Sequence, residues 1–127
     1  MKNFTIGAEI KRILLSDPEI RSKANNKCFP IVASKGTTFP FILYSRTGFT
    51  PRSNKDYSGE KVTVQFLIIA KKYEDAVELA NDVADCLISN SETTIIEDIK
   101  ILNIREDYNF SDDCYVEIID VDFELKE

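Results

Sequence analysis

The chain has 127 residues, 43% of them hydrophobic and 30% charged, so residues 1–127 fit a single domain with one core. It contains no histidine, which removes the commonest general base and the commonest zinc ligand. No apolar run approaches the ~20 residues of a membrane-spanning helix. The N-terminus lacks the layout of a signal peptide, so we expect an intracellular protein with no membrane partner.

The formal net charge of −6 is unevenly distributed along the chain. Residues 106–127 hold nine acidic side chains against one lysine, a balance of −8, whereas residues 1–105 hold fifteen basic and thirteen acidic ones, a balance of +2. Because broad nucleic-acid binding needs a basic face, this distribution disfavours it. Cys28, Cys86 and Cys114 form no short metal-binding or redox pair, so we interpret them as buried apolar groups.

Two segments open the chain. Ile6, Ile10, Ile13 and Leu14 recur at helical spacing and predict an amphipathic helix, which Pro18 ends. Ile20 is expected to return to the core from a short turn. The apolar run over residues 29–32 contains a proline, which favours an edge strand.

Alternating side chains then predict two half-buried antiparallel strands over residues 41–46 and 61–70. The apolar stripe of residues 73–89, with acids in its first turn, predicts a helix. Residues 94–106 and 114–125 are expected to be extended on either side of a polar turn at 108–113. Since Glu117 falls among apolar positions, a bulge near residues 118–119 would shift the alternation.

These elements predict an α+β fold with an antiparallel sheet of four to five strands and two helices packed on one face. Residues 47–59 are too long for a tight hairpin, so this segment is either a mobile, solvated loop or an interaction site. Its aromatic and basic side chains favour partner binding. The candidate partner-binding residues are Arg46, Phe49, Arg52, Lys55 and Tyr57.

A second candidate surface is acidic and comprises Asp112, Asp113, Asp120, Asp122 and Glu124. Oxygen ligands of this kind could hold a divalent cation, but the spacing lacks a known calcium loop. A solvated face, or one that meets a basic surface on another subunit, is favoured. We therefore predict no metal site and no cofactor, and no nucleophile accompanied by a base, so the chain is expected not to be an enzyme.

The order of these segments resembles the small tail-completion (tail-terminator-like) proteins of long-tailed bacteriophages and prophages. The resemblance covers residue 6 to the end and thins after Ser89. It rests on an ordered set: Ile10–Leu15, Phe29-Pro30, Gly36-Thr37-Thr38-Phe39-Pro40 before the strand at 41–44, Gly59, Val62–Ile69, and Tyr73-Glu74-Asp75-Ala76 through Leu87.

The resemblance implies a structural subunit that forms a ring, expected to be a hexamer, which caps the tail tube, ends its polymerisation and offers a surface for joining the head. The implied partners are further copies of the chain, a tail-tube protein and a head–tail connector protein. DNA would pass through the ring without specific binding. The resemblance also implies assembly in the host cytoplasm and a place in the virion tail.

Two roles for the acidic residues follow from that expectation. They could meet a basic surface of the neighbouring subunit, through Lys23, Lys27, Arg46 or Arg52. Alternatively, they could line the channel and repel phosphate. A head-completion or neck adaptor protein, a small-ligand binding module and a metal-dependent hydrolase remain alternatives.

Overall fold

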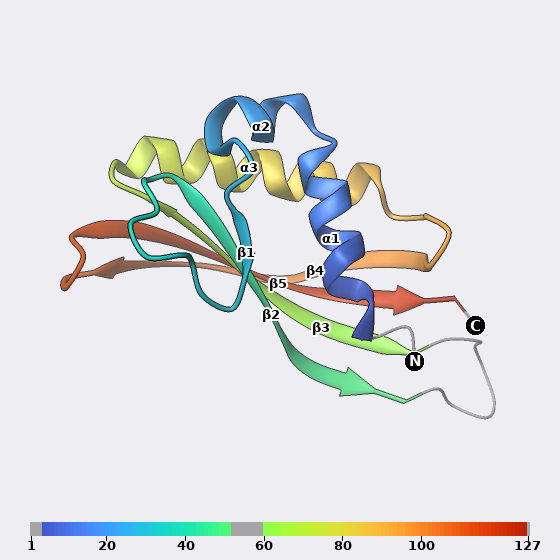
Figure 1. Ribbon diagram of the computed structural model, residues 1–127. Coiled ribbons are helices and arrows are strands. Elements are labelled where there is room, and N and C mark those ends of the chain that lie inside the picture. Colours follow the sequence, from blue (N-terminus) through green and yellow to red (C-terminus); the bar gives the residue numbers. More distant parts are fainter. Residues whose placement is uncertain (1–3, 52–59, 127) are drawn as a thin grey trace.

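A computed structural model describes residues 4–51 and 60–126. Within these ranges three helices cover one face of a five-stranded sheet, and the other face has no helix over it (Figure 1). The elements are α1 (Ile6–Leu15), α2 (Pro18–Ala24), β1 (Cys28–Pro30), β2 (Phe41–Thr50), β3 (Lys61–Ala70), α3 (Tyr73–Ser89), β4 (Ile96–Asn109) and β5 (Cys114–Leu125). The predicted α+β class is confirmed.

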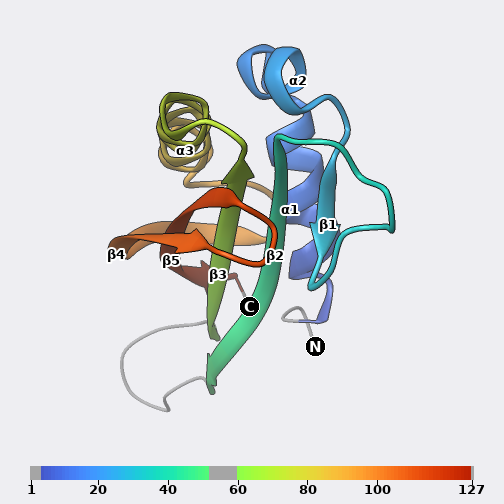
Figure 2. The same ribbon diagram turned by 90° about the vertical axis from the view of Figure 1, so that its left-hand side faces the viewer.

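The strand order is β1-β2-β3-β5-β4. The β2–β3, β3–β5 and β4–β5 pairs are antiparallel, as predicted. The short edge strand β1 pairs with β2 in parallel, through Cys28–Pro30 and the segment from Ile42 to Tyr44. The sheet is therefore mixed. It is also strongly twisted, so that β4 and β5 cross the direction of β2 and β3 in Figure 2.

The segment expected to be a turn around Ile20 is a third helix, α2. Asp17 caps it, because its carboxylate accepts hydrogen bonds from the backbone N–H groups of Glu19 at 2.9 Å and Ile20 at 3.3 Å. Pro18 occupies the first turn, where its missing N–H costs nothing. Ile20 is fully buried, as predicted.

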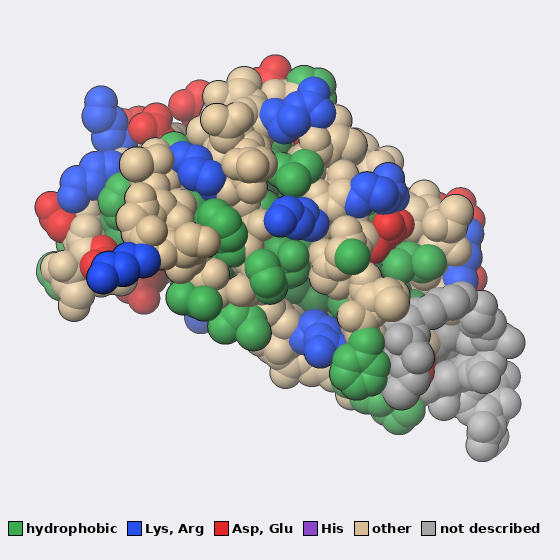
Figure 3. All heavy atoms as spheres, in the orientation of Figure 1, with side chains coloured by type: hydrophobic (Ala, Val, Ile, Leu, Met, Phe, Trp, Pro, Cys, Tyr) green, Lys and Arg blue, Asp and Glu red, His purple; other side chains and the backbone are tan. Residues whose placement is uncertain are grey.

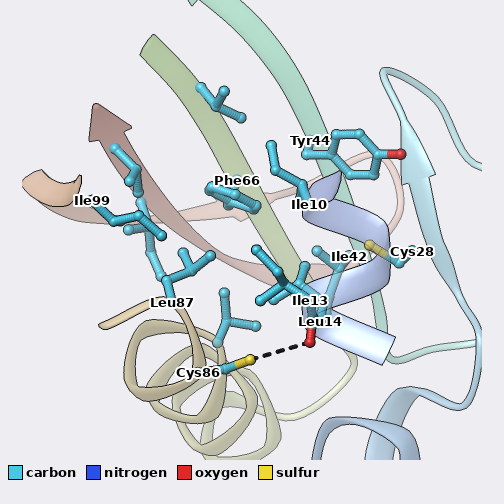
Figure 4. Packing of buried hydrophobic residues seen from close by; sticks show 14 of the residues in the cluster. Ile10, Ile13, Leu14, Cys28, Ile42, Tyr44, Phe66, Cys86, Leu87 and Ile99 are labelled. Atoms are coloured by element: carbon cyan, nitrogen blue, oxygen red, sulfur yellow. Dashed lines mark hydrogen bonds between the residues drawn. The ribbon is translucent and has the colours of Figure 1, made fainter. Parts of the chain in front are cut away.

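The core lies between the helices and the sheet (Figure 4). Ile10 and Ile13 from α1 and Leu87 from α3 pack toward buried side chains of the central strands, such as Phe66. The rings of Phe66 and Phe123 lie 6.3 Å apart between centroids and join β3 to β5. These inward residues follow the alternation seen in the sequence.

The predicted bulge in β5 is wrong. The β3–β5 register runs without interruption from Lys61↔Glu124 to Ala70↔Tyr115. Register shifts occur instead in β4, between Ile96 and Asp98 and between Ile101 and Asn103. Because the register of β5 with β3 is continuous, Glu117 keeps the inward position that the alternation gives it and is buried, with 5% of its surface exposed.

The segment over residues 47–59 is not a loop throughout. β2 continues to Thr50, which pairs with Lys61 of β3. The register of the two strands shifts once, at a bulge between Arg46 and Gly48. The strand is longer than predicted because β3 offers an equally long partner, even though residues 46–50 are exposed. The remainder of the predicted loop includes residues 52–59, which lie outside the described residues.

All three cysteines are buried and unbridged, as predicted. Burial raises the pKa of the Cys28 and Cys86 thiols to about 12. Because the thiolate is the reactive species, we expect native protein to react very slowly with a thiol reagent such as Ellman's reagent at pH 8. All three thiols should react at once in denaturing urea. Stoichiometric reaction of the native protein would contradict this arrangement.

Candidate interaction surfaces

The first predicted site lies partly on β2. Arg46 and Phe49 are exposed near its end, and the Arg46 guanidinium carbon lies 4.8 Å from the ring centroid of Phe4. Arg52, Lys55 and Tyr57 lie outside the described residues, so the predicted cluster can be followed only through its first two members. These two belong to the sheet edge rather than to a flexible arm.

Two hollows border this end of β2. One, of about 370 Å³, is lined by Ile31, Ser45, Arg46, Gly48, Phe49 and Val62. The other, of about 200 Å³, lies between the start of α1 and the β1–β2 edge, with Phe4, Gly7, Pro30 and Tyr44 among its lining residues. In Figure 3, apolar side chains form a band on this side of the molecule that reaches the end of β2.

The five predicted acidic residues do not form one cluster. Asp112 and Asp113 lie in the turn of the β4–β5 hairpin, which projects beyond the helices in Figure 1. Asp112 accepts a hydrogen bond from the Asn109 amide at 3.2 Å, and Asp113 pairs with Lys71 at 3.4 Å. Asp112 is therefore bonded within the turn, whereas Asp113 links the turn to the segment between β3 and α3.

Asp120, Asp122 and Glu124 lie on the face of β5 that points away from the helices, as the alternation predicted. Asp120 pairs with Arg105 at 3.2 Å and accepts from the Gln65 amide at 3.3 Å. Asp122 accepts from the Thr63 hydroxyl at 2.6 Å. Two of the three acids are therefore already compensated by neighbouring strands.

Two of the basic residues expected to meet an acidic neighbour are also engaged. The Lys23 ammonium pairs with Asp82 of α3, and the pKa of Lys23 is raised, chiefly by this hydrogen bond. The Lys27 ammonium donates to the Thr38 carbonyl at 2.9 Å. A salt-bridged subunit contact through Lys23 would have to break an existing pair, which makes that part of the hypothesis unfavourable.

An unpredicted cluster lies where β4, β5 and the start of α3 meet. Glu106 stands directly opposite Glu117 in the β4–β5 register. The Tyr73 hydroxyl donates to Glu106 at 2.6 Å, and the Tyr115 ring packs edge-on against Tyr73. Burial, together with the hydrogen bond and charge of Glu106, raises the pKa of Glu117 to about 7, whereas the Tyr73 hydrogen bond lowers the pKa of Glu106.

The signal for this cluster was present in the sequence, because Glu117 interrupts an apolar series at an inward position. Interpreting that interruption as a bulge concealed it. The pair combines one carboxyl whose pKa is raised, Glu117, with one whose pKa is lowered, Glu106, and the Tyr73 hydroxyl donates to the latter. Among residues 4–51 and 60–126, no group of three or more histidine, cysteine or acidic side chains could hold a metal ion.

In the same ranges, no helix is long and apolar enough to cross a membrane.

No protein-family model matches the chain, and no curated protein sequence matches it. A solved structure described as "Virion of native gene transfer agent (GTA) particle" contains a chain that is similar to it, with a TM-score of 0.70. The similarity covers 93% of this chain and 92% of that one at 12% identity, so it shows a shared fold.

Proposed function

We propose that this chain is a structural tail-completion (tail-terminator-like) protein of a bacteriophage or prophage. It forms a ring, expected to be a hexamer, which caps the tail tube, ends polymerisation and provides the surface that joins the head. The observation that supports this proposal best is the fold shared with a chain of a gene transfer agent virion over nearly the full length of both. The resemblance of the ordered sequence segments is independent support.

In this proposal the chain works through shape and self-association and is not an enzyme. Heterologous contacts between identical subunits generate a ring when the rotation closes. They require two different surfaces on each subunit, and the sheet has two different edges, β1–β2 and β4. The partners are further copies, the tail-tube protein and the head–tail connector protein, with assembly in the host cytoplasm.

The charge on the open sheet face is compatible with a channel that DNA crosses without sticking. Its acids Asp98, Asp120, Asp122 and Glu124 are interspersed with the bases Lys61, Lys100 and Arg105. These seven charges sum to −1, and Asp107, opposite Val116 in the register, adds a further acid to this face, so the face lacks the basic character that binds phosphate. We assign the three β5 acids to the channel wall rather than to a strongly basic neighbour, because two of them already have partners.

The test is co-assembly with purified phage proteins. We expect a closed oligomer of this chain to bind the tip of polymerised tail tubes and to stop their elongation, as seen by electron microscopy and light scattering. A neck adaptor protein, which the virion likeness also supports, would instead be retained by portal or connector protein and leave elongation unaffected. Failure to bind or shorten tubes at any salt concentration would contradict the tail-completion role.

A further inference from the structure

We propose that the outer edge of β2 at residues 47–50 pairs with the outer edge of β4 from a second copy of the chain. The two sheets would then join edge to edge. This inference rests on the proposed ring, and it identifies the surfaces that close it. It arises from two exposed strand edges, two hollows and a set of exposed apolar side chains in one fold.

The first step concerns hydrogen bonding at the two edges. Among the strands of residues 4–51 and 60–126, β4 is the last of the sheet and pairs only with β5. On the other side, β1 covers β2 only from Ile42 to Tyr44, and no described strand pairs with the outer edge of residues 47–50. Exposed strand edges present N–H and C=O groups that readily pair with another strand.

The second step concerns the space beside β2. One hollow lies beside Gly48 and Phe49, and the other lies beside residues 44–46 of the same strand. Three exposed apolar side chains border them: Phe4 is 70% exposed, Ile31 74% and Phe49 46%. Ile31 has a φ of 68°, an unfavourable conformation for a β-branched residue. Such strain persists where the surrounding structure requires it and is concentrated at functional positions. The edge therefore lies in an apolar groove and not on a flat surface.

The third step concerns what β4 would place in that groove. Leu102 and Ile104 on this strand are 49% and 57% exposed, although each is large and apolar. The β4–β5 register skips Leu102, which lies between Ile101 and Asn103. The four residues of the β2 edge extend about 13 Å, and the 14 residues of β4 are more than long enough to match them.

Strand direction is consistent with a ring. Since the β2–β3, β3–β5 and β5–β4 pairs are all antiparallel, β4 runs opposite to β2 within one copy. When β4 of one copy is placed beside β2 of the next so that the twisted sheet continues, this opposite direction along the ladder is kept, and the new pair is antiparallel. Antiparallel pairs form hydrogen bonds perpendicular to the strands and are slightly more stable per residue than parallel pairs. Repeating the same contact would continue the sheet around an axis.

Bulges at both edges restrict this pairing. β2 is irregular between Arg46 and Gly48, and β4 between Ile101 and Asn103. Bulges twist a strand locally and oppose indiscriminate edge pairing. A pair formed by these two edges must accommodate both bulges. This requirement restricts the register in which β2 of one copy can pair with β4 of the other. A second copy is the partner we favour because this chain itself supplies both complementary edges.

Disulfide trapping tests the contact directly. A tagged chain carries either Thr47→Cys or Gly48→Cys, and an untagged chain carries either Leu102→Cys or Ile104→Cys. Each tagged variant is mixed with each untagged variant. We expect at least one mixture to form a covalent dimer under mild oxidation, and each variant alone to form little. The native cysteines should not interfere, because all three are buried.

A matched pair of substitutions tests the energetics. Ile104→Arg should weaken self-association about tenfold or more, because it places a charge in the apolar groove. Ile88→Arg is the control, since Ile88 is 56% exposed, compared with 57% for Ile104, and belongs to the helix α3 and not to either edge strand. Sedimentation velocity measures the association of each variant. Unchanged melting temperatures would show that both remain folded.

The outcomes separate this inference from the proposed function. If wild-type chain forms a closed oligomer on tail tubes but no mixture cross-links and Ile104→Arg assembles normally, the edge pairing is wrong and the ring stands. If the mixtures cross-link but the product is an open filament or a two-fold dimer, the pairing stands and the ring fails. If the chain stays monomeric with and without tail-tube protein, both are wrong.

Discussion

Replacing Phe123 with alanine should lower the free energy of unfolding by about 3–5 kcal/mol. Phe123 is fully buried, its ring lies 6.3 Å from that of Phe66, and it stands opposite Val62 on β3 and Ile99 on β4. Truncation would leave a cavity where three strands meet the helix layer. Since small domains have about 5–15 kcal/mol of stability in total, this single change should remove a large part of it.

Urea unfolding followed by circular dichroism measures this loss. Phe110→Ala is the matched control, because Phe110 lies in the hairpin turn with 88% of its surface exposed. Its ring contacts only the edge of Tyr108 at 4.9 Å among the contacts described, so we expect a loss below about 1 kcal/mol. Similar losses for both variants would mean that the sheet and helices are not joined through Phe123.

The elements with strong periodicity could be predicted from the sequence, and those that depend on distant partners could not. α3 was predicted over the same residues that the structure shows, because its stripe and acidic first turn are local signals. α2 was missed because seven residues show too little periodicity, although the Asp17-Pro18 start was visible. The parallel pairing of β1 depends on its position beside β2, which no local pattern specifies.

The candidate surfaces show the same division. Alternation along β5 placed Asp120, Asp122 and Glu124 on one face correctly. It could not reveal that Asp112 is bonded within the hairpin turn, that Asp113 pairs with Lys71, or that Lys23 is engaged by Asp82. The predicted position of the bulge was wrong because one anomaly, Glu117, has two explanations in sequence. Either β5 contains a bulge that turns Glu117 outward, or the strand is regular and the Glu117 carboxyl is buried. Only the pairing of β5 with β3 distinguishes the two.

Glu117→Gln should remove a pH dependence of stability that the native protein shows between about pH 4.5 and 7. The pKa of Glu117 rises from 4.5 to about 7 on folding, so in this window the folded chain keeps a proton that the unfolded chain has lost. Its contribution is therefore fully present below pH 4.5 and is lost as pH rises to 7, by up to about 3 kcal/mol. Glu106, whose pKa is lowered, contributes in the opposite direction below pH 4.5.

Urea unfolding at pH 5 and pH 8 tests this expectation. The glutamine amide can donate to Glu106 as the protonated acid does, so the variant should be more stable than the native protein at pH 8 and nearly equal to it at pH 5. Glu124→Gln is the control, because Glu124 lies on the same strand but on the open face. If Glu117→Gln leaves the difference between the two pH values unchanged, the buried carboxyl is ionised throughout. Glu106 and Glu117 would then both be ionised, and no proton would lie between the two carboxyl groups.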